Sequence, residues 1–206
     1  MFAFGENTAH PGRYPPKQMA SHQQLKAWLE SDASELVATI VADIQRHVNT
    51  LLSSGDSFYG YAALPGDYCT QPNPASLVVA FNRESDIASE NSAEPYYRYS
   101  VDEWQNYVHD GFDDTNSKLK SQLAQFKELH SPAVDSYELD EYEIAFVDKT
   151  NRAILDALLE LKRKGTFGSD TYLIIWFSDS DYEIMNDSAK ALNDAEVYEQ
   201  YAAEFQ

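Results

Sequence analysis

The chain has 206 residues, 43% of them hydrophobic and 13% aromatic, which is enough to bury one substantial core but short for two ordinary domains. Its 34 acidic and 15 basic residues give a formal net charge of -19. Because phosphate backbones and anionic membranes bind clustered Lys and Arg, this balance argues against a nucleic acid or a membrane as a partner.

The first quarter of the chain predicts an irregular arm followed by two helices. Residues 1–18 contain Pro and Gly without apolar periodicity, and a short helix is expected over 19–30. From Asp32 to Leu52 apolar residues recur at intervals of three and four, which predicts an amphipathic helix. Asp32 and Glu35 have the spacing of a capping box at its start.

Three apolar runs predict strands. Residues 57–64 and 76–82 flank a Pro-rich loop at 65–74, so we expect them to form an antiparallel pair. Residues 171–177, with the sequence TYLIIWF, are continuously apolar. This run is typical of a central strand covered on both faces.

A junction in the middle of the chain carries specific local chemistry. The four residues before Ser100 predict a further short strand, which runs straight into a helix ending near residue 129. Ser100 and Glu103 have capping-box spacing, and Tyr99 and Trp104 occupy the positions of a hydrophobic staple. We therefore interpret these four residues as a structural motif.

The remaining elements complete an α+β fold. A helix is predicted over 141–164, and one or two short acidic helices over 181–205, broken near Asn193. The sequence thus predicts one mainly antiparallel sheet of about four strands packed against three or more long helices. The expected organisation is a single domain over 19–206 after the irregular arm.

Few patterns indicate catalysis, and we assign no catalytic residue, metal or cofactor. The chain has no P-loop, no dinucleotide-binding fingerprint and no zinc-protease motif. Asp179 and Asp181 follow a predicted strand and could hold a cation, but Ser180 and Glu183 have the spacing of a helix cap there.

His109 and Asp113 share a face of the predicted central helix at i, i+4 spacing. A metal-dependent hydrolase that uses either the Asp179 and Asp181 pair or His109 with Asp113 therefore stays open as an alternative. A second alternative is a regulatory domain that binds a small ligand beside Tyr59, Tyr61 and Tyr97.

Acidic residues cluster in two segments, which favours a non-catalytic module that binds a basic protein partner. One segment runs from Asp135 to Asp148 without a Lys or Arg, and the other begins at Asp179 and contains only one Lys. Aromatic residues within them could anchor the partner. The residues predicted to bind it are Asp135, Glu138, Asp140, Glu141, Tyr142, Asp179, Asp181 and Tyr182.

The chain resembles a bacterial family of unknown function over roughly residues 32–195. The resemblance rests on SFYGYAAL at 57–64, AFN at 80–82, YYRYSVDEW at 96–104, and Phe112 with Asn116. The family has an FYxxA strand and a YxWSxxEW-like strand-to-helix junction. Some of its members lie among toxin and immunity genes, so the resemblance implies an immunity-like binding protein.

The expected compartment is the cytoplasm. The single cysteine, Cys69, excludes an intramolecular disulfide and fits a reducing environment. Residues 1–10 lack the pattern of a secretory signal, and the longest wholly apolar stretch near the C-terminus, at 173–177, is too short to cross a bilayer.

Overall fold

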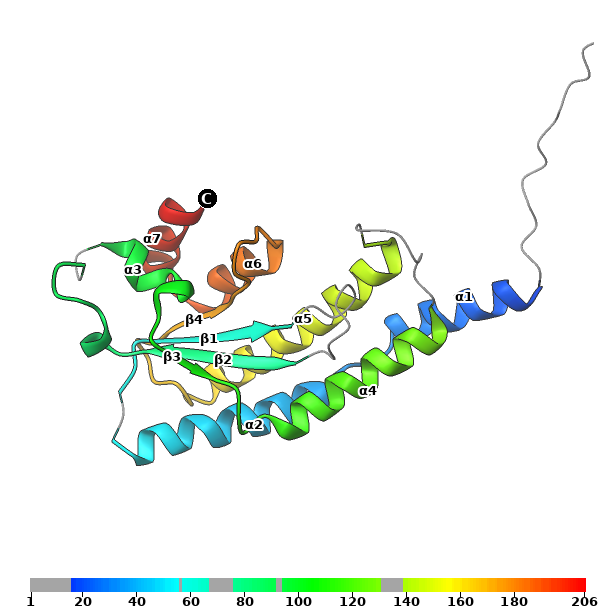
Figure 1. The fold of residues 1–206 in the computed structure, drawn as a ribbon, viewed down its shortest axis with the longest axis horizontal. Helices are drawn as coiled ribbons and strands as arrows, with labels where there is room; N and C mark the ends of the chain where they lie inside the picture. The colour runs from blue at the N-terminus through cyan, green and yellow to red at the C-terminus, as the bar shows by residue number, and fades with distance from the viewer. Residues whose placement is uncertain (1–15, 56, 67–75, 92–93, 131–138) are drawn as a thin grey trace, which may run out of the picture.

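The computed structural model describes residues 16–55, 57–66, 76–91, 94–130 and 139–206. These residues form an α+β fold, as predicted, in which helices cover a four-stranded mixed sheet (Figure 1). Most of the predicted arm and of the Pro-rich loop lies outside the described residues. The first helix, α1 (Pro16–Leu29), begins three residues before its predicted start at residue 19.

The sheet has the strand order β3-β2-β1-β4. The predicted antiparallel pair is confirmed as β1 with β2, β3 joins β2 antiparallel, and β4 runs parallel to β1. The strands are β1 (Gly60–Pro65), β2 (Leu77–Asn82), β3 (Asn106–Val108) and β4 (Tyr172–Ile175).

Strand β4 is fully buried, as predicted, but it lies at an edge of the sheet and not at its centre. One side chain from the middle of α6 (Glu183–Leu192) and one just beyond its end take the place of a neighbouring strand. The backbone N–H of Ile175 donates to Ser188 Oγ at 2.9 Å, and that of Leu173 donates to Asn193 Oδ1 at 2.9 Å. The edge is therefore closed to further strands.

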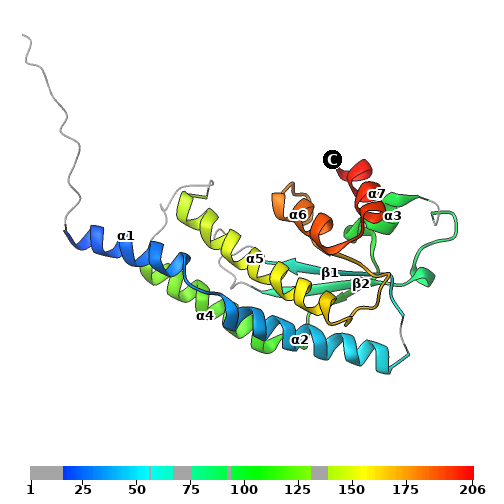
Figure 2. The same ribbon diagram turned by 180° about the vertical axis from the view of Figure 1, so that it is seen from behind.

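Successive side chains of each strand point to opposite faces of the sheet and pack into two separate cores. On one face Tyr61, Val79 and Leu173 pack under the long helices, and on the other face Ala62 and Ile174 lie in a smaller core. The main helices of the larger core are α1, α2 (Ser34–Ser53), α4 (Asp113–Leu129) and α5 (Glu141–Arg163), and α6 adds Ile184 and Leu192. Figures 1 and 2 show α3 (Pro95–Tyr99), α6 and α7 (Ala195–Phe205) grouped away from α2 and α4.

The predicted strand-to-helix junction is wrong. Residues 96–99 belong to the short helix α3, and the helix predicted to begin at Ser100 begins only at Asp113. Between these helices lie the 3-10 turn η2 (Val101–Glu103) and strand β3.

Two local features and one remote contact explain this difference. Pro95 occupies the first turn of α3, where its fixed φ and missing N–H suit a helix. Gly111 has φ +89, which turns the chain before α4. The buried carboxylate of Asp43, on α2, then accepts a hydrogen bond from the N–H of Thr115 at 2.9 Å and so fixes the start of α4.

The predicted capping box and staple at this junction are also absent. Ser100 makes no side-chain cap, and only the backbone N–H of Glu103 bonds to its carbonyl oxygen, at 3.2 Å. The Glu103 carboxylate instead accepts from the hydroxyl of Tyr96 at 3.3 Å. Tyr99 and Trp104 are buried against the sheet in the smaller core.

Two further predicted capping boxes do not form. Helix α2 begins at Ser34, so Asp32 accepts from the Ser34 N–H at 3.0 Å and not from Glu35. Helix α6 begins at Glu183 without a side-chain cap from Ser180. Their Ser and Asp residues bond within the turns that precede the helices, which is a common alternative for these side chains.

Candidate functional site

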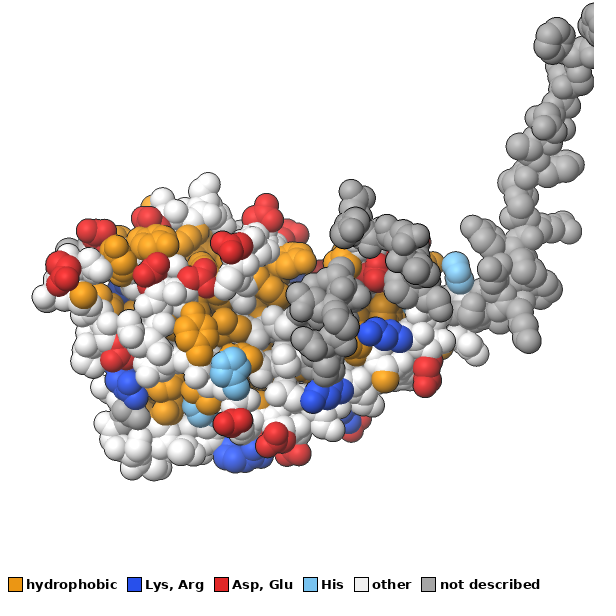
Figure 3. All heavy atoms as spheres, in the orientation of Figure 1, with side chains coloured by type: hydrophobic (Ala, Val, Ile, Leu, Met, Phe, Trp, Pro, Cys, Tyr) orange, Lys and Arg blue, Asp and Glu red, His pale blue; other side chains and the backbone are white. Residues whose placement is uncertain are grey.

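A groove of about 340 Å³ lies just beyond the carboxyl end of β4. It is formed by η2, the segment after β4, the start of α6 and the end of α7. On the face shown in Figure 3, Asp and Glu side chains gather over α6 and α7 with hydrophobic side chains between them. Segments that are remote in sequence therefore meet at this groove.

Aromatic rings form much of the groove. The ring of Tyr96 stacks on Phe205 with centroids 6.1 Å apart, and Trp176 meets Phe205 edge-on at 5.6 Å. Tyr182, which is 45% exposed, meets Phe177 edge-on at 4.8 Å. The groove thus presents ring faces and edges beside open solvent.

Four carboxylates line the same groove, and its described lining contains no Lys or Arg. Three of them, Asp179, Asp181 and Glu183, make no hydrogen bond or ion pair with the residues that the structure describes. The fourth, Asp102, accepts hydrogen bonds on Oδ1 from Trp176 Nε1 at 3.1 Å and from the Ser178 hydroxyl. Its second oxygen, Oδ2, accepts none from the described part of the chain.

Ser100, a largely buried residue, adds a hydroxyl to the groove. The residue is only 2% exposed and lines the cavity, yet its Oγ makes no hydrogen bond to any described residue. The Oγ atom is not among the fully buried polar atoms that lack a partner, so it keeps some contact with solvent. The capping role predicted for Ser100 is absent, so this hydroxyl is available to a ligand.

The structure brings together three of the residues predicted to bind a partner. Asp179, Asp181 and Tyr182 line the groove, and Asp179 has a positive φ of 53°. Asp140, Glu141 and Tyr142 lie instead at the start of α5, on the side of the molecule near α1 and α4 (Figures 1 and 2). Asp135 and Glu138 lie outside the described residues.

Asp140 has a structural role at the start of α5. Its carboxylate accepts from the N–H groups of Tyr142 and Glu143, both at 2.9 Å, and contacts His130 Nε2 at 2.6 Å. Burial tends to raise the pKa of Asp140, but the bonds from Glu143 and His130 outweigh it and the pKa is lowered. Glu143 completes a capping box that the sequence reasoning missed.

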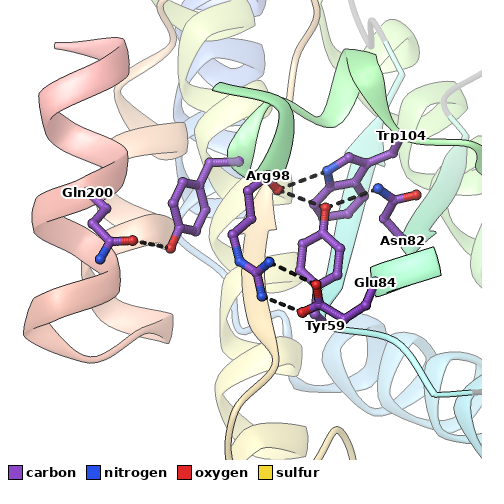
Figure 4. Close-up of polar contacts among 7 residues, drawn as sticks. Tyr59, Asn82, Glu84, Arg98, Trp104 and Gln200 are labelled. Atoms are coloured by element: carbon purple, nitrogen blue, oxygen red, sulfur yellow. Dashed lines mark hydrogen bonds and ion pairs between the residues drawn. The ribbon is translucent and has the colours of Figure 1, made fainter. Parts of the chain in front are cut away.

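The Tyr96–Trp104 region is held to the sheet by a polar cluster (Figure 4). Asn82 Nδ2 donates to the hydroxyl of Tyr59 at 3.0 Å, and that hydroxyl and Trp104 Nε1 both donate to the Arg98 carbonyl at 3.2 Å. The Arg98 guanidinium lies 4.3 Å above the Tyr59 ring and forms two hydrogen bonds with Glu84. These contacts fix the chain that leads into the groove wall.

The residues considered for metal chemistry are not arranged as predicted. His109 lies just after β3 and Asp113 is the first residue of α4, so the two do not share a helix. Among the described residues, no group of three or more His, Cys, Asp or Glu side chains could hold a metal ion. Cys69 lies outside the described residues.

The tyrosines considered for a small-ligand site do not face one cavity. Tyr61 is fully buried in the larger core, and Tyr59 is buried beneath Arg98. Tyr97 lines a separate cavity of about 110 Å³ with Asn82.

The chain thus has an α+β fold with an acidic, aromatic-lined groove at one end of β4. The chain belongs to the DUF4303 family, a domain of unknown function, whose family model matches residues 40–194. This match confirms the expectation of an uncharacterised domain family. No curated protein and no solved structure matches the chain. Among the described residues, no helix is both long enough and apolar enough to cross a membrane.

Sequence reasoning predicted three of the fifteen described residues that line the groove, namely Asp179, Asp181 and Tyr182. Ser100 and Asp102 were hidden within an apparent helix start, and Trp176 within an apolar strand. Tyr201 and Phe205 come from the last helix. Two signals were usable: the acidic segment that begins at Asp179, and the position of Asp179 after a buried strand, because ligands of open α/β sheets bind beyond the carboxyl ends of strands.

Proposed function

We propose that this protein is a non-catalytic protein-binding module that takes a basic segment of a partner protein into the acidic groove. The observation that carries the proposal is the combination of four carboxylates with aromatic rings in a groove whose described lining has no Lys or Arg. A cationic side chain there gains charge-assisted hydrogen bonds from the carboxylates and cation–π attraction from the rings.

The charge of the whole chain supports the same partner chemistry. A formal net charge of -19 attracts a basic protein over long range and raises its association rate. Screening by salt weakens this steering, because the Debye length falls to about 8 Å at physiological ionic strength. Binding should therefore be strongest at low salt.

We further propose an immunity-like role, in which the groove covers a basic surface that a toxin needs for its activity. The support for this finer reading is the resemblance to a family with members among toxin and immunity genes, together with the acidic character of the chain.

Affinity capture from a native lysate tests the binding proposal. The bait proteins are the wild type and a triple variant, Asp179→Asn/Asp181→Asn/Glu183→Gln. We expect the wild type to retain a basic protein stoichiometrically at low salt and the triple variant to lose most of it.

A matched control separates the groove from the overall charge. Asp110→Asn/Glu128→Gln/Asp156→Asn removes the same number of negative charges at exposed positions that do not line the groove. The control should retain the partner. Capture of no basic protein at low salt, or equal capture by the groove variant, would contradict the proposal.

A further inference from the structure

We infer that the groove recognises an extended segment in which an arginine lies two positions from a large apolar residue. This inference rests on the proposed function and specifies the partner's chemistry. It follows from a second cavity beside the acidic groove and from the unused hydroxyl of Ser100.

The second cavity is small and mainly apolar. It measures about 250 Å³ and lies at the carboxyl ends of β1 and β4, which run parallel. Leu64 and Pro65 line it from β1, and Val147 lines it from α5. Ligand pockets for whole small molecules span about 300–1,000 Å³, so this volume suits a single large side chain.

The two cavities are direct neighbours. Four residues line both of them, namely Trp176, Phe177, Ser180 and Tyr182. In an extended chain, side chains two positions apart point to the same side and lie about 7 Å from each other. A bound segment can therefore place one side chain in each cavity.

The polar groups of the acidic groove favour arginine over lysine. Ser100 Oγ and Asp102 Oδ2 both lack a partner among the described residues and belong to one wall. A guanidinium offers five N–H donors in a planar fork and stacks on aromatic rings, whereas an ammonium is a compact point charge. Arginine can thus engage the hydroxyl, the carboxylate and a ring together.

Ser100 is the strongest indication of a ligand. It is nine-tenths buried or more, lines the groove, and contributes no side-chain hydrogen bond to the fold. Removing its hydroxyl should leave the melting temperature unchanged or slightly higher, because no bond within the described structure is lost. An effect of this change on binding would therefore not arise from misfolding.

A random heptapeptide display library, selected on the wild-type protein, tests the inference. We expect enrichment of peptides with Arg two positions from Leu, Ile, Val, Met or Phe. Basic peptides enriched without that spacing would overturn this inference and leave the proposed function standing. Failure to enrich any basic peptide at low salt would contradict both.

The most enriched peptide is then synthesised and titrated by calorimetry. Changing its Arg to Lys should weaken binding about fivefold, because the planar fork and the stacking are lost. Ser100→Ala should weaken it about tenfold, while Ser117→Ala, an exposed serine outside the groove, should not.

Leu64→Gln probes the second cavity. It should weaken the selected peptide but not a version in which the apolar residue is replaced by Gly. Equal affinity of the wild type, Ser100→Ala and Leu64→Gln for the selected peptide would overturn the inference.

Discussion

Replacing Gly60 by alanine should destabilise the fold through a single collision. A Cβ atom at Gly60 would lie 2.6 Å from Cη2 and 2.7 Å from Cζ2 of Trp104. Trp104 is 4% exposed, and its Nε1 donates to the Arg98 carbonyl at 3.2 Å. Its ring also meets Tyr59 and Tyr172 edge-on, so the indole has no free space into which to move.

The cost follows from two opposing effects. Alanine in a strand normally stabilises by about 0.5–1 kcal/mol over glycine, because the unfolded chain loses less entropy. Overpacking of a tight core costs about 1–3 kcal/mol. We expect a cost near the upper end of this range, because the contacts would be below 3.0 Å and the Trp104 ring cannot move away. We expect a net loss of about 2 kcal/mol in the free energy of unfolding.

A double-mutant cycle measured by urea denaturation identifies the collision. Trp104→Phe removes the two atoms that the new Cβ would meet, so Gly60→Ala should cost little or nothing in that background. Circular dichroism is the suitable probe, because the tryptophan change alters fluorescence. If Gly60→Ala costs the same in both backgrounds, or less than about 0.5 kcal/mol in the wild type, the packing argument fails.

Three other predictions test individual groups. Tyr172→Phe should leave the free energy of unfolding unchanged or raise it by up to about 1 kcal/mol, since the buried Tyr172 hydroxyl has no partner among the described residues. A clear loss of stability in urea denaturation would contradict this prediction. Asp43→Ala should cost about 2 kcal/mol in the same assay by leaving the Thr115 N–H without its cap, and Asp43→Asn should cost less. Burial lowers the pKa of His47 in the folded state. The buried neutral side chain therefore contributes its stability above about pH 6.5, and this contribution is lost as the pH falls through the lower folded-state pKa. His47→Gln should flatten stability against pH between 7 and 5, and an unchanged slope would contradict this assignment.

The long periodic elements could be predicted from sequence because their signal is local. The amphipathic stripes of α2 and α5 and the apolar run of β4 were all assigned correctly. The edge position of β4 could not be predicted, because Ser188 and Asn193 complete it from a later segment.

The prediction of the strand-to-helix junction failed for the same reason as the prediction of a central β4, namely contacts from segments that are remote in sequence. The spacing of Ser100 and Glu103 satisfies a local rule, but tertiary contacts decide the conformation. Trp104 packs on Gly60, and Asp43 fixes the start of α4 from another helix. Three residues that line the groove, Tyr96, Ser100 and Asp102, belong to this junction, so sequence reasoning could not place them in the candidate site.

The acidic residues fall into two groups, those that stabilise the fold and those that line the groove. Asp43 and Asp140 cap helices, and Glu84 binds Arg98, so these carboxylates stabilise the fold. Asp179 and Asp181, by contrast, bond to no described residue and share the groove with Asp102 and Glu183, where no Lys or Arg of the described lining offsets the like charges. Proteins retain such locally unfavourable groups where function requires them. Acids without a described partner also occur outside the groove, at Asp110, Glu128 and Asp156, but those of the groove lie together beside aromatic rings, where a cationic partner would use them.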